Sequence, residues 1–322
     1  MALAGSKALV TGGAGFIGSH LTDALIKQGC KVTVLDDFSN GLEENLDEAG
    51  RTGMVNTVRG SVEDYSLVKS LVADADYVFH EAALNLLRSM EDPARDLLVN
   101  TSGTLNVLMA IKEANPGCLM VHASTGSVYG EPRYSPQDEN HPANPVSPYG
   151  VSKLAAEHYI RLWAHLQGIK AVILRYYNVY GPRQNYGKKG GVVGIFIENV
   201  LRGQAPTIEG TGNNERCFTY VDDVVRANIL AAATEGATGN VMNIATTEIT
   251  TINTLAEMIL KTGKSDLKPV YVPARPGDIA VFRPDISRAE KLLGYRPQVT
   301  LREGLQKTLD WFLQTGRVTT DL

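Results

Sequence analysis

Short runs of β-branched and apolar residues alternate with longer amphipathic segments up to about residue 175 of the chain. Continuous apolar runs are typical of strands in a parallel sheet that is covered on both faces. The expected strands are Lys7–Thr11, Lys31–Leu35, Asn56–Arg59, Asp76–His80, Cys118–Ser124 and Lys170–Arg175. The helices expected between them include Phe16–Gln28, Tyr65–Val72, Ala94–Ala114 and Tyr149–Gln167. This alternation predicts an α/β fold with a doubly wound parallel sheet.

Beyond residue 176 glycine and proline become more frequent, and the expected helices are shorter. These helices are Ile195–Arg202, Val221–Thr234, Thr251–Lys261 and Leu301–Gln314. We expect residues 177–218 and 246–322 to form a smaller mixed α/β lobe that binds the substrate. Residues 1–176, together with about 219–245, are expected to form the sheet domain. Small ligands usually bind in a cleft between two such lobes.

The composition of the 322 residues is ordinary for a globular α/β protein, with 43% hydrophobic and 20% charged residues. The net charge of −4 gives no general attraction to nucleic acid or acidic membranes, so phosphate must be bound by local chemistry. Three widely spaced cysteines and six histidines form no disulfide frame and no cluster with metal-ligand spacing, so we expect no metal. No signal peptide and no long apolar run occur, which predicts a soluble cytosolic protein.

A glycine-rich loop follows the first expected strand and opens the first helix. Gly12, Gly15 and Gly18 have the spacing GxxGxxG, a variant of the dinucleotide-binding fingerprint. Gly12 permits a tight turn, Gly15 lets the backbone approach a pyrophosphate, and Gly18 allows close packing of helix and strand. The N-terminus of the helix also attracts phosphate. The loop therefore predicts a Rossmann-type domain that binds a dinucleotide.

Asp36 stands at the end of the second expected strand, where it selects between cofactors. A carboxylate there accepts hydrogen bonds from the adenosine ribose and repels a 2′-phosphate. Residues 37–40 contain no arginine that could hold such a phosphate. We therefore expect NAD as the cofactor.

Two segments of the chain fit the pattern YxxxK, and their contexts differ. Tyr149 and Lys153 follow Ser147 and Pro148, which are good residues for the cap and first position of a helix, so both side chains lie on its first turn. That helix follows the fifth strand, near the nicotinamide end of the cofactor. The other pair, in residues 65–69, follows the third strand and is expected on the adenine side or on the surface. We predict Tyr149 and Lys153 to be catalytic.

A tyrosine that acts as a base near neutral pH needs its pKa lowered from about 10, by roughly 3 units. A neighbouring ammonium group and the positive nicotinamide ring both favour the phenolate. The fifth strand ends in residues 123–130, which are rich in serine, threonine and glycine. A small hydroxyl group there could share the substrate proton with Tyr149, although such a segment is also an ordinary turn.

With these motifs in place, the sequence resembles the extended short-chain dehydrogenases that act on nucleotide sugars, a family that includes UDP-glucose 4-epimerase. The resemblance covers essentially the whole chain. It rests on GGAGFIGSH at 12–20, HEAA at 80–83, STGSVYG at 124–130, SPYGVSK at 147–153, LRYYNVYGPRQ at 174–184, FTYVDDVV at 218–225 and RPGD at 275–278.

The resemblance implies roles for further residues. Thr125 corresponds to the catalytic Ser or Thr of the family. The residues implied to bind the cofactor, beyond those above, are Phe16, Ile17, Asp37, Asn40, Gly41, Ser61, Val62, Ala82, Ala83, Asn100 and Tyr176. The residues implied to bind the nucleotide sugar are Thr125, Ser127, Tyr149, Asn178, Val192, Val193, Arg216, Arg275 and Asp278. Two arginines suit a diphosphate because the guanidinium fork matches phosphate oxygens. Their alternative role is in surface salt bridges.

Two departures from the family pattern affect these implications. The chain has Gly60-Ser61-Val62 where the family usually has Gly-Asp-Ile or Gly-Asp-Val near the adenine, so the adenine contact is altered. Residues 190–193 lack the asparagine that is common in galactose epimerases at this edge of the substrate, which leaves the identity of the sugar open.

The residues after Thr125 distinguish related chemistries. Relatives that dehydrate or decarboxylate sugars resemble one another in carrying an acid where this chain has Ser127, and dehydratases also usually have Asp where it has Gly126. The pattern therefore favours an NAD-dependent epimerase that inverts C4 of a nucleotide sugar through a 4-keto intermediate, and we expect this substrate to be a UDP-sugar. The alternatives are a 4,6-dehydratase or another lyase or decarboxylase, and a non-catalytic dinucleotide-binding regulator.

The resemblance also implies a homodimer, in which helices at about 94–114 and 149–167 pair with their copies. The apolar residues compatible with this pairing, or with packing on the sheet, are Leu97, Leu105, Leu108, Leu154 and Leu162.

Overall fold

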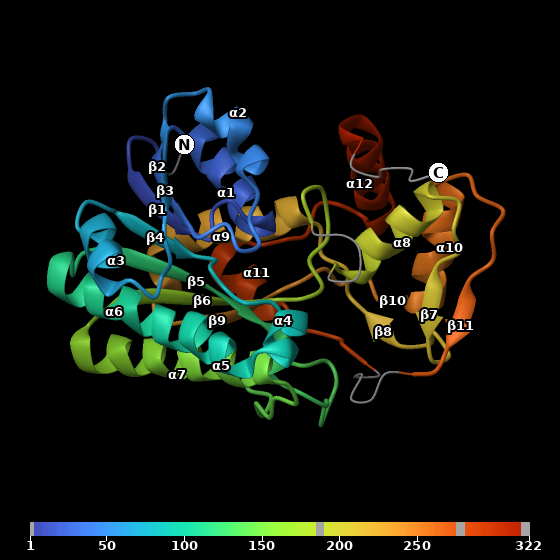
Figure 1. The fold of residues 1–322 in the computed structure, drawn as a ribbon. Helices are drawn as coiled ribbons and strands as arrows, with labels where there is room; N and C mark the ends of the chain where they lie inside the picture. The colour runs from blue at the N-terminus through green and yellow to red at the C-terminus, as the bar shows by residue number, and fades with distance from the viewer. Residues whose placement is uncertain (1–2, 185–189, 275–280, 317–322) are drawn as a thin grey trace.

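The structure is a computed structural model, which describes residues 3–184, 190–274 and 281–316. Its centre is a seven-stranded parallel sheet with the strand order β3-β2-β1-β4-β5-β6-β9 (Figure 1). The strands are β1 Lys7–Thr11, β2 Lys31–Asp36, β3 Val55–Arg59, β4 Tyr77–His80, β5 Leu119–Thr125, β6 Lys170–Tyr176 and β9 Val241–Ile244. The doubly wound α/β fold expected from the sequence is confirmed, and β9 extends the sheet by one strand.

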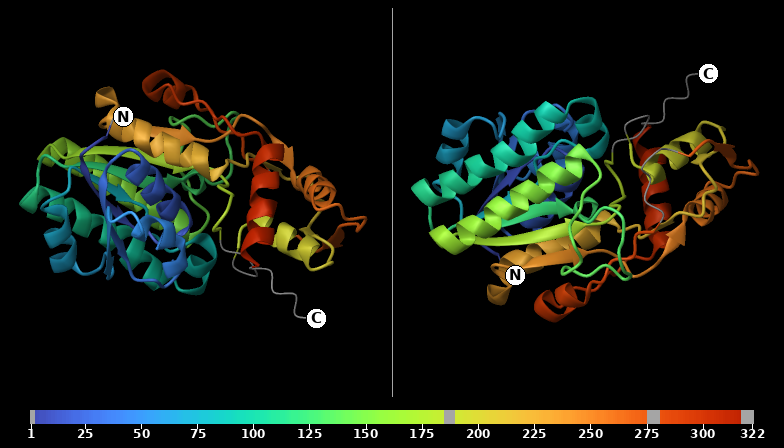
Figure 2. Two further views of the ribbon diagram at one scale, coloured as in Figure 1. Left: turned by 90° about the horizontal axis from the view of Figure 1, so that it is seen from above. Right: turned by 90° about the horizontal axis from the view of Figure 1, so that it is seen from below.

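Helices cover both faces of the sheet because its strands are apolar on both sides. One face carries α1 (Phe16–Lys27), α9 (Val221–Ala233) and α11 (Ser287–Leu293), with α2 (Asp47–Gly50) beside α1. The other face carries α3 (Tyr65–Val72), α6 (Gly103–Ala114) and α7 (Pro148–Gln167), and α6 and α7 lie side by side (Figure 2). A separate cluster of buried apolar side chains fills each face.

The segment expected as one helix at 94–114 consists of three pieces. These are α5 (Pro93–Asp96), a π-helix η2 (Leu97–Ser102) and α6, with α4 (Leu86–Glu91) preceding them. A π-helix is uncommon, and such turns are frequent at functional sites.

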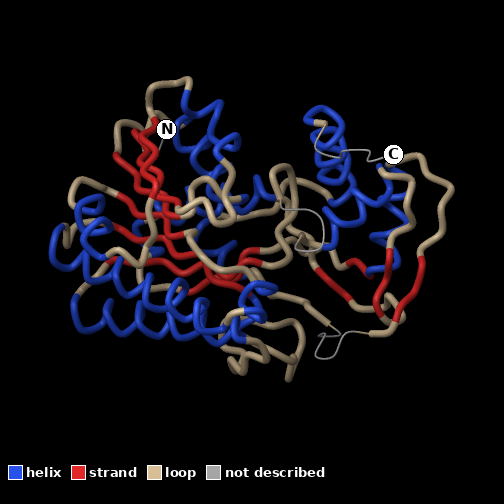
Figure 3. The backbone as a smooth tube through the Cα atoms, viewed as in Figure 1, coloured by secondary structure: helices blue, strands red, loops and turns tan. Residues whose placement is uncertain are grey.

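A smaller second lobe lies at one end of the sheet (Figure 3). It contains α8 Val192–Leu201, α10 Ile252–Thr262, α12 Leu301–Thr315 and the strands β7 Thr207–Glu209, β8 Glu215–Arg216, β10 Thr250–Thr251 and β11 Val270–Val272. These strands form two small sheets, β7 with β11 and β8 with β10. α11 packs on β9 and α9, although the expected division places its residues in the second lobe. The short helices η1 (Glu43–Leu46), η3 (Gly126–Val128) and η5 (Glu235–Ala237) complete the described elements.

The parallel strands direct all their carboxyl ends toward one edge of the sheet. Thr11 pairs in register with His80, and Thr125 pairs with Tyr176, so the residues that follow these strands meet there. Ligands of doubly wound sheets bind at this edge. Within the described residues, no helix is long and apolar enough to cross a membrane.

Candidate active site

The turn between β1 and α1 requires glycine at two positions. Gly12 has φ of 68°, its N–H donates to the carbonyl of Leu35 at 2.7 Å, and a Cβ there would lie 2.7 Å from the backbone nitrogen of Ala82. A Cβ on Gly18 would lie 2.1 Å from the carbonyl oxygen of Gly12. The glycines therefore let α1 begin directly against β1, and no side chain caps its N-terminus. Such a helix start can receive phosphate.

A pocket opens in front of this turn. Most residues expected to bind the cofactor line it: Gly12, Gly15, Phe16, Ile17, Gly18, Asp36, Asp37, Asn40, Gly41, Ser61, Val62, Ala82 and Ala83. The pocket also contains Glu81, Leu84 and Val99. It extends from the end of β2 to the end of β4, and this elongated arrangement fits a dinucleotide that crosses the carboxyl edge of the sheet.

At the β2 end of the pocket, the backbone holds the carboxylate of Asp36. Its two oxygens accept hydrogen bonds from the N–H groups of Ala14 (2.9 Å) and Phe38 (2.8 Å). Burial raises the pKa of this carboxyl, and the two backbone hydrogen bonds oppose that effect. The side chain is thereby oriented toward the position of a ribose.

The structure also places an arginine near Asp36 that the sequence analysis did not consider. The guanidinium carbon of Arg59 lies 4.2 Å from the ring centre of Phe38, and the same side chain pairs with Glu43. Arg59 comes from the neighbouring strand β3, outside the segment 37–40 that was searched. Arg59 forms an exposed ion pair with Glu43, while the carboxylate of Asp36 is the group that would repel a 2′-phosphate.

The tyrosine and lysine predicted to be catalytic lie on the first turns of α7. The Ser147 hydroxyl caps this helix by accepting from the N–H of Gly150 at 3.2 Å, and Pro148 takes the first position, as the sequence predicts. Lys153 is 1% exposed, and burial lowers its pKa to about 8. The Thr125 side chain interacts with the Tyr149 phenol, and Glu81 acts electrostatically on both Tyr149 and Lys153.

Among the protein's own groups, burial dominates the ionisation of Tyr149. It raises the pKa of the phenol to about 12, and the negative charges of Asp96 and Glu81 act in the same direction. The hydrogen bond with Thr125 opposes this rise. The direction of this shift is thus opposite to the lowering expected from Lys153. The positive nicotinamide ring is the remaining group that can favour the phenolate.

The loop after β5 has no room for a larger side chain at residue 126. Thr125 caps η3 by accepting from the N–H of Ser127 at 3.1 Å, and its hydroxyl donates to Ser127 Oγ at 3.2 Å. A Cβ on Gly126 would lie 2.6 Å from the ring of Tyr177. An acidic residue at position 126 would therefore require Tyr177 to move.

Asn100 supports the site from behind instead of lining the pocket. Its side chain is fully buried in the π-helix η2 and donates to Asp96 at 2.6 Å and to Ser152 at 3.2 Å. Its Oδ1 accepts from the backbone N–H of Leu84 at 2.8 Å. Asn100 thus joins the pocket wall to α7, and the pattern of apolar residues gave no sign of the π-helix that allows this.

Glu81 is a further site residue, to which the sequence analysis assigned no role. It follows β4, lines the pocket and accepts a hydrogen bond from the hydroxyl of Tyr176 at 2.8 Å. Tyr176 in turn accepts from the amide of Asn228 at 2.7 Å. Burial raises the pKa of Glu81 to about 7.

The residues expected to bind the substrate are less closely grouped than those expected to bind the cofactor. Asn178 follows β6 with a positive φ of 38°, and its side chain is exposed. Arg216 on β8 lies with its guanidinium carbon 5.4 Å from the ring of Phe282, which also packs edge-on against Tyr177. Phe282 thus lies between Arg216 of the second lobe and Tyr177, on which Gly126 of the loop after β5 packs.

Val192 and Val193 begin α8, and the Val193 side chain is 2% exposed in the core, so only its backbone can reach a ligand. Arg275 and Asp278 lie outside the described residues.

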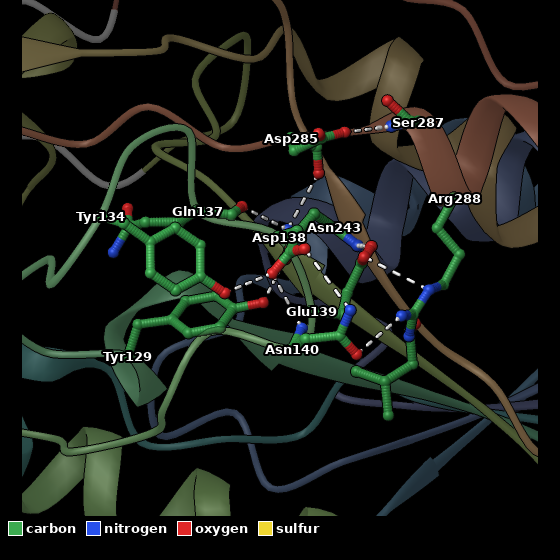
Figure 4. A network of polar contacts seen from close by, with 11 residues as sticks. Tyr129, Tyr134, Gln137, Asp138, Glu139, Asn140, Asn243, Asp285, Ser287 and Arg288 are labelled. Carbon is green, nitrogen blue, oxygen red and sulfur yellow. Dashed lines mark hydrogen bonds and ion pairs between the residues drawn. The ribbon is translucent and has the colours of Figure 1, made fainter.

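A polar network holds the segment that follows the catalytic loop (Figure 4). The hydroxyl of Tyr129 donates to Asn243 Oδ1 at 2.8 Å, and the Asn243 side chain donates to the carbonyl of Asp285 at 3.0 Å. The carboxylate of Glu139 accepts from the N–H of Asn243 at 2.8 Å and pairs with Arg288. This network fixes residues 129–146 against β9 and the start of α11.

No group of three or more histidine, cysteine, aspartate or glutamate residues among the described positions could hold a metal ion.

Comparison with known proteins agrees with this site. Residues 8–245 match the model of the NAD dependent epimerase/dehydratase family. The chain belongs to this family, and NAD is its cofactor. It is 38% identical over 309 residues to the UDP-glucose 4-epimerase of Mycolicibacterium smegmatis, covering 95% of this chain and 98% of the relative.

Two further similarities show the range of the family. A UDP-N-acetyl-alpha-D-glucosaminuronate decarboxylase of Bacillus cytotoxicus is 34% identical, covering 95% of this chain and 97% of the relative. A crystal structure of UDP-glucose 4-epimerase from Thermotoga maritima with UDP-glucose superposes with a TM-score of 0.90 at 40% identity. It covers 96% of this chain and 99% of that chain. The chain is thus an enzyme of a family that includes both epimerases and decarboxylases.

Proposed function

We propose that the chain is a nucleotide-sugar 4-epimerase acting on a UDP-sugar through a transient 4-keto intermediate. The observation that carries this proposal is the arrangement of residues 125–127, at the end of β5 and in the loop that follows it. The side chains of Thr125 and Tyr149 interact, while Gly126 packs on Tyr177 and Ser127 offers only a hydroxyl group. This arrangement can move a hydroxyl proton, but residues 126–127 hold no acid for removing a proton from carbon or for expelling water.

When bound, NAD accepts a hydride from C4 of the sugar and returns it to the opposite face. Tyr149 removes the proton of the C4 hydroxyl and gives it back after the sugar has turned. Thr125 shares this proton through its hydrogen bond with the phenol. Lys153 holds a positive charge beside the cofactor ribose and the tyrosine. No step requires a second acid–base group.

We also infer that the nucleotide sugar binds between the sheet domain and the second lobe. Arg216 and Arg275 would hold the diphosphate, and Asn178 would contact it from the end of β6. Asp278 would bind the nucleotide ribose, while Ser127, Val192 and Val193 would lie along the sugar and the base. The UDP-glucose epimerases among the relatives support a UDP-sugar.

The direct test is a panel of UDP-, dTDP- and GDP-sugars incubated with the purified protein and followed by NMR. The expected product is the C4 epimer of one UDP-sugar, without loss of mass. A 4-keto-6-deoxy product or release of carbon dioxide would instead assign the chain to the dehydratases or decarboxylases.

A further inference from the structure

One carboxylate of the catalytic centre has no part in the proposed mechanism. Glu81 lies where β4 enters the cofactor pocket, and its backbone N–H donates to the carbonyl of Thr11 at 3.1 Å, which fixes the position of the residue. The hydroxyl of Tyr176 donates to its Oε1 at 2.8 Å. The carboxylate therefore stays inside the pocket and does not turn toward solvent.

The neighbouring strands and helices place a defined set of polar groups around Glu81. The Tyr176 hydroxyl that binds it is fixed from α9, because the Asn228 amide donates to the phenol oxygen at 2.7 Å. Lys153 and Tyr149 on α7 both interact electrostatically with Glu81. The charged and titratable groups that face Lys153 and Tyr149 in turn are Asp96, Glu157, His80 and His122.

Most of these groups hold a fixed charge near neutral pH. Burial lowers the pKa of His80 to about 3 and that of His122 well below its usual value, so both rings are neutral. Glu157 is paired with Arg175. Glu81 and Lys153 differ: burial raises the pKa of Glu81 to about 7 and lowers that of Lys153 to about 8, so both can change charge between pH 6 and 9.

The Glu81 side of the pocket is also where the nicotinamide ring belongs. Asp36 marks the adenosine end, and the residues after β4 lie at the opposite end, beside Tyr149 and Lys153. A negative charge there stabilises the positive, oxidised nicotinamide ring more than the neutral, reduced ring. It also opposes ionisation of Tyr149 and favours protonation of Lys153.

We propose that Glu81 is a positioning residue that tunes the redox balance of the catalytic centre. Its carboxylate favours the oxidised cofactor, so that hydride taken from the sugar is returned rather than retained. This role rests on the proposed hydride transfer. A cofactor that remains reduced cannot complete the reaction, and the keto intermediate then has time to leave the site. By favouring return of the hydride, Glu81 limits this release.

The test uses the NAD-loaded enzyme and a chemical hydride donor, cyanoborohydride, so that no sugar is required. Reduction of the bound cofactor is followed at its near-ultraviolet absorbance between pH 6 and 9. In the unaltered enzyme the rate should rise as the pH falls through about 7, because protonation removes the negative charge of Glu81. Glu81→Gln should react roughly tenfold or more faster than the unaltered enzyme at pH 8.5. It should lose the part of the step that Glu81 contributes, and the rise that remains belongs to protonation of Lys153.

Two further variants make the result specific. Tyr176→Phe removes the hydrogen bond that lowers the pKa of Glu81, so the step should move to higher pH while its amplitude remains. This variant also tests the proposal if Glu81→Gln fails to fold or to retain NAD. Glu113→Gln changes an exposed acid that pairs with Lys69 and should leave the curve unchanged.

The proposal is overturned if the curves of Glu81→Gln and the unaltered enzyme superimpose, or if the step stays in place in Tyr176→Phe. Failure of the proposed function would give a different result. The pH-rate curves of the unaltered enzyme and Glu81→Gln would then differ as expected, but neither of these two proteins would interconvert any nucleotide sugar.

Discussion

Tyr149 and Tyr65 both begin a YxxxK pair, but their surroundings differ. Tyr149 interacts with Thr125 beside the cofactor pocket, whereas Lys69 of the other pair forms an ion pair with Glu113 on the surface. Tyr149→Phe should therefore lower turnover by about 100- to 10,000-fold, the usual effect of a positioned acid–base group. Binding of the nucleotide sugar should change little. Steady-state kinetics and calorimetric titration measure the two effects.

The matched control for this variant is Tyr65→Phe, which should leave turnover unchanged. Equal losses in both variants would contradict the assignment of Tyr149 as the base, because only a general effect on folding could explain them.

Asp36 determines the choice of cofactor in this account. NAD should bind at least about tenfold more tightly than NADP, which corresponds to about 1.4 kcal/mol. Asp36→Ala should narrow this difference, since it removes a negative charge and leaves Arg59 nearby. Adding Arg59→Ala should abolish the gain in NADP binding. Fluorescence titration with both cofactors tests this, and equal affinities in the unaltered protein would refute the role of Asp36.

Among the single elements, helix α1 can begin close to β1 only because Gly18 has no side chain. Gly18→Ala would place a Cβ 2.1 Å from a backbone oxygen, so the helix must shift away from β1. NAD binding should weaken by roughly tenfold or more. Gly50→Ala, at an exposed site with no atom near the new Cβ, should bind NAD normally. If Gly18→Ala retains full NAD affinity, this contact is not essential to the site.

The elements themselves were largely predictable, because strands buried on both faces read as continuous apolar runs. The six expected strands occur within one residue at each end, and α3 was predicted with its observed bounds. Two features were not predictable. The π-helix η2 has only six residues, which are too few for a change of period to show in the apolar pattern. The short strands of the second lobe have too few residues for a period-2 pattern.

The site was predicted where its residues follow one another in motifs, and missed where the fold brings them together. The glycines and the pair Tyr149 and Lys153 are local patterns. Glu81 acquires its surroundings only when β4 and β6 lie in one sheet and Tyr176 donates to it. Similarly, Arg59 approaches Asp36 only because β3 pairs with β2. Proximity across strands is not encoded in the spacing along the chain.

For the whole molecule we propose a homodimer. Apolar side chains are exposed on α4, η2 and α7, which adjoin one another: Met90, Leu97, Leu98, Val151, Tyr159, Leu162 and Leu166. Such a surface marks an interaction site. Leu108, which was also considered for this surface, is fully buried and packs toward the sheet.

Light scattering at micromolar concentration should therefore give about twice the chain mass of 34.8 kDa. Leu162→Glu should yield the monomer mass, because it places a charge in this surface. Leu313→Glu, on the exposed part of α12, should leave the dimer intact. A monomer mass for the unaltered protein would exclude the proposed pairing.

The central claim is that hydride leaves C4 of a nucleotide sugar and returns to the same carbon. It is tested most directly by running the reaction in deuterium oxide with the UDP-sugar that the panel identifies as substrate and examining the product by NMR. The account predicts the C4 epimer with protium at both C4 and C5, since neither carbon exchanges its hydrogen with solvent. Deuterium at C5, or release of water from the sugar, would contradict 4-epimerisation and require another acid–base group in the site.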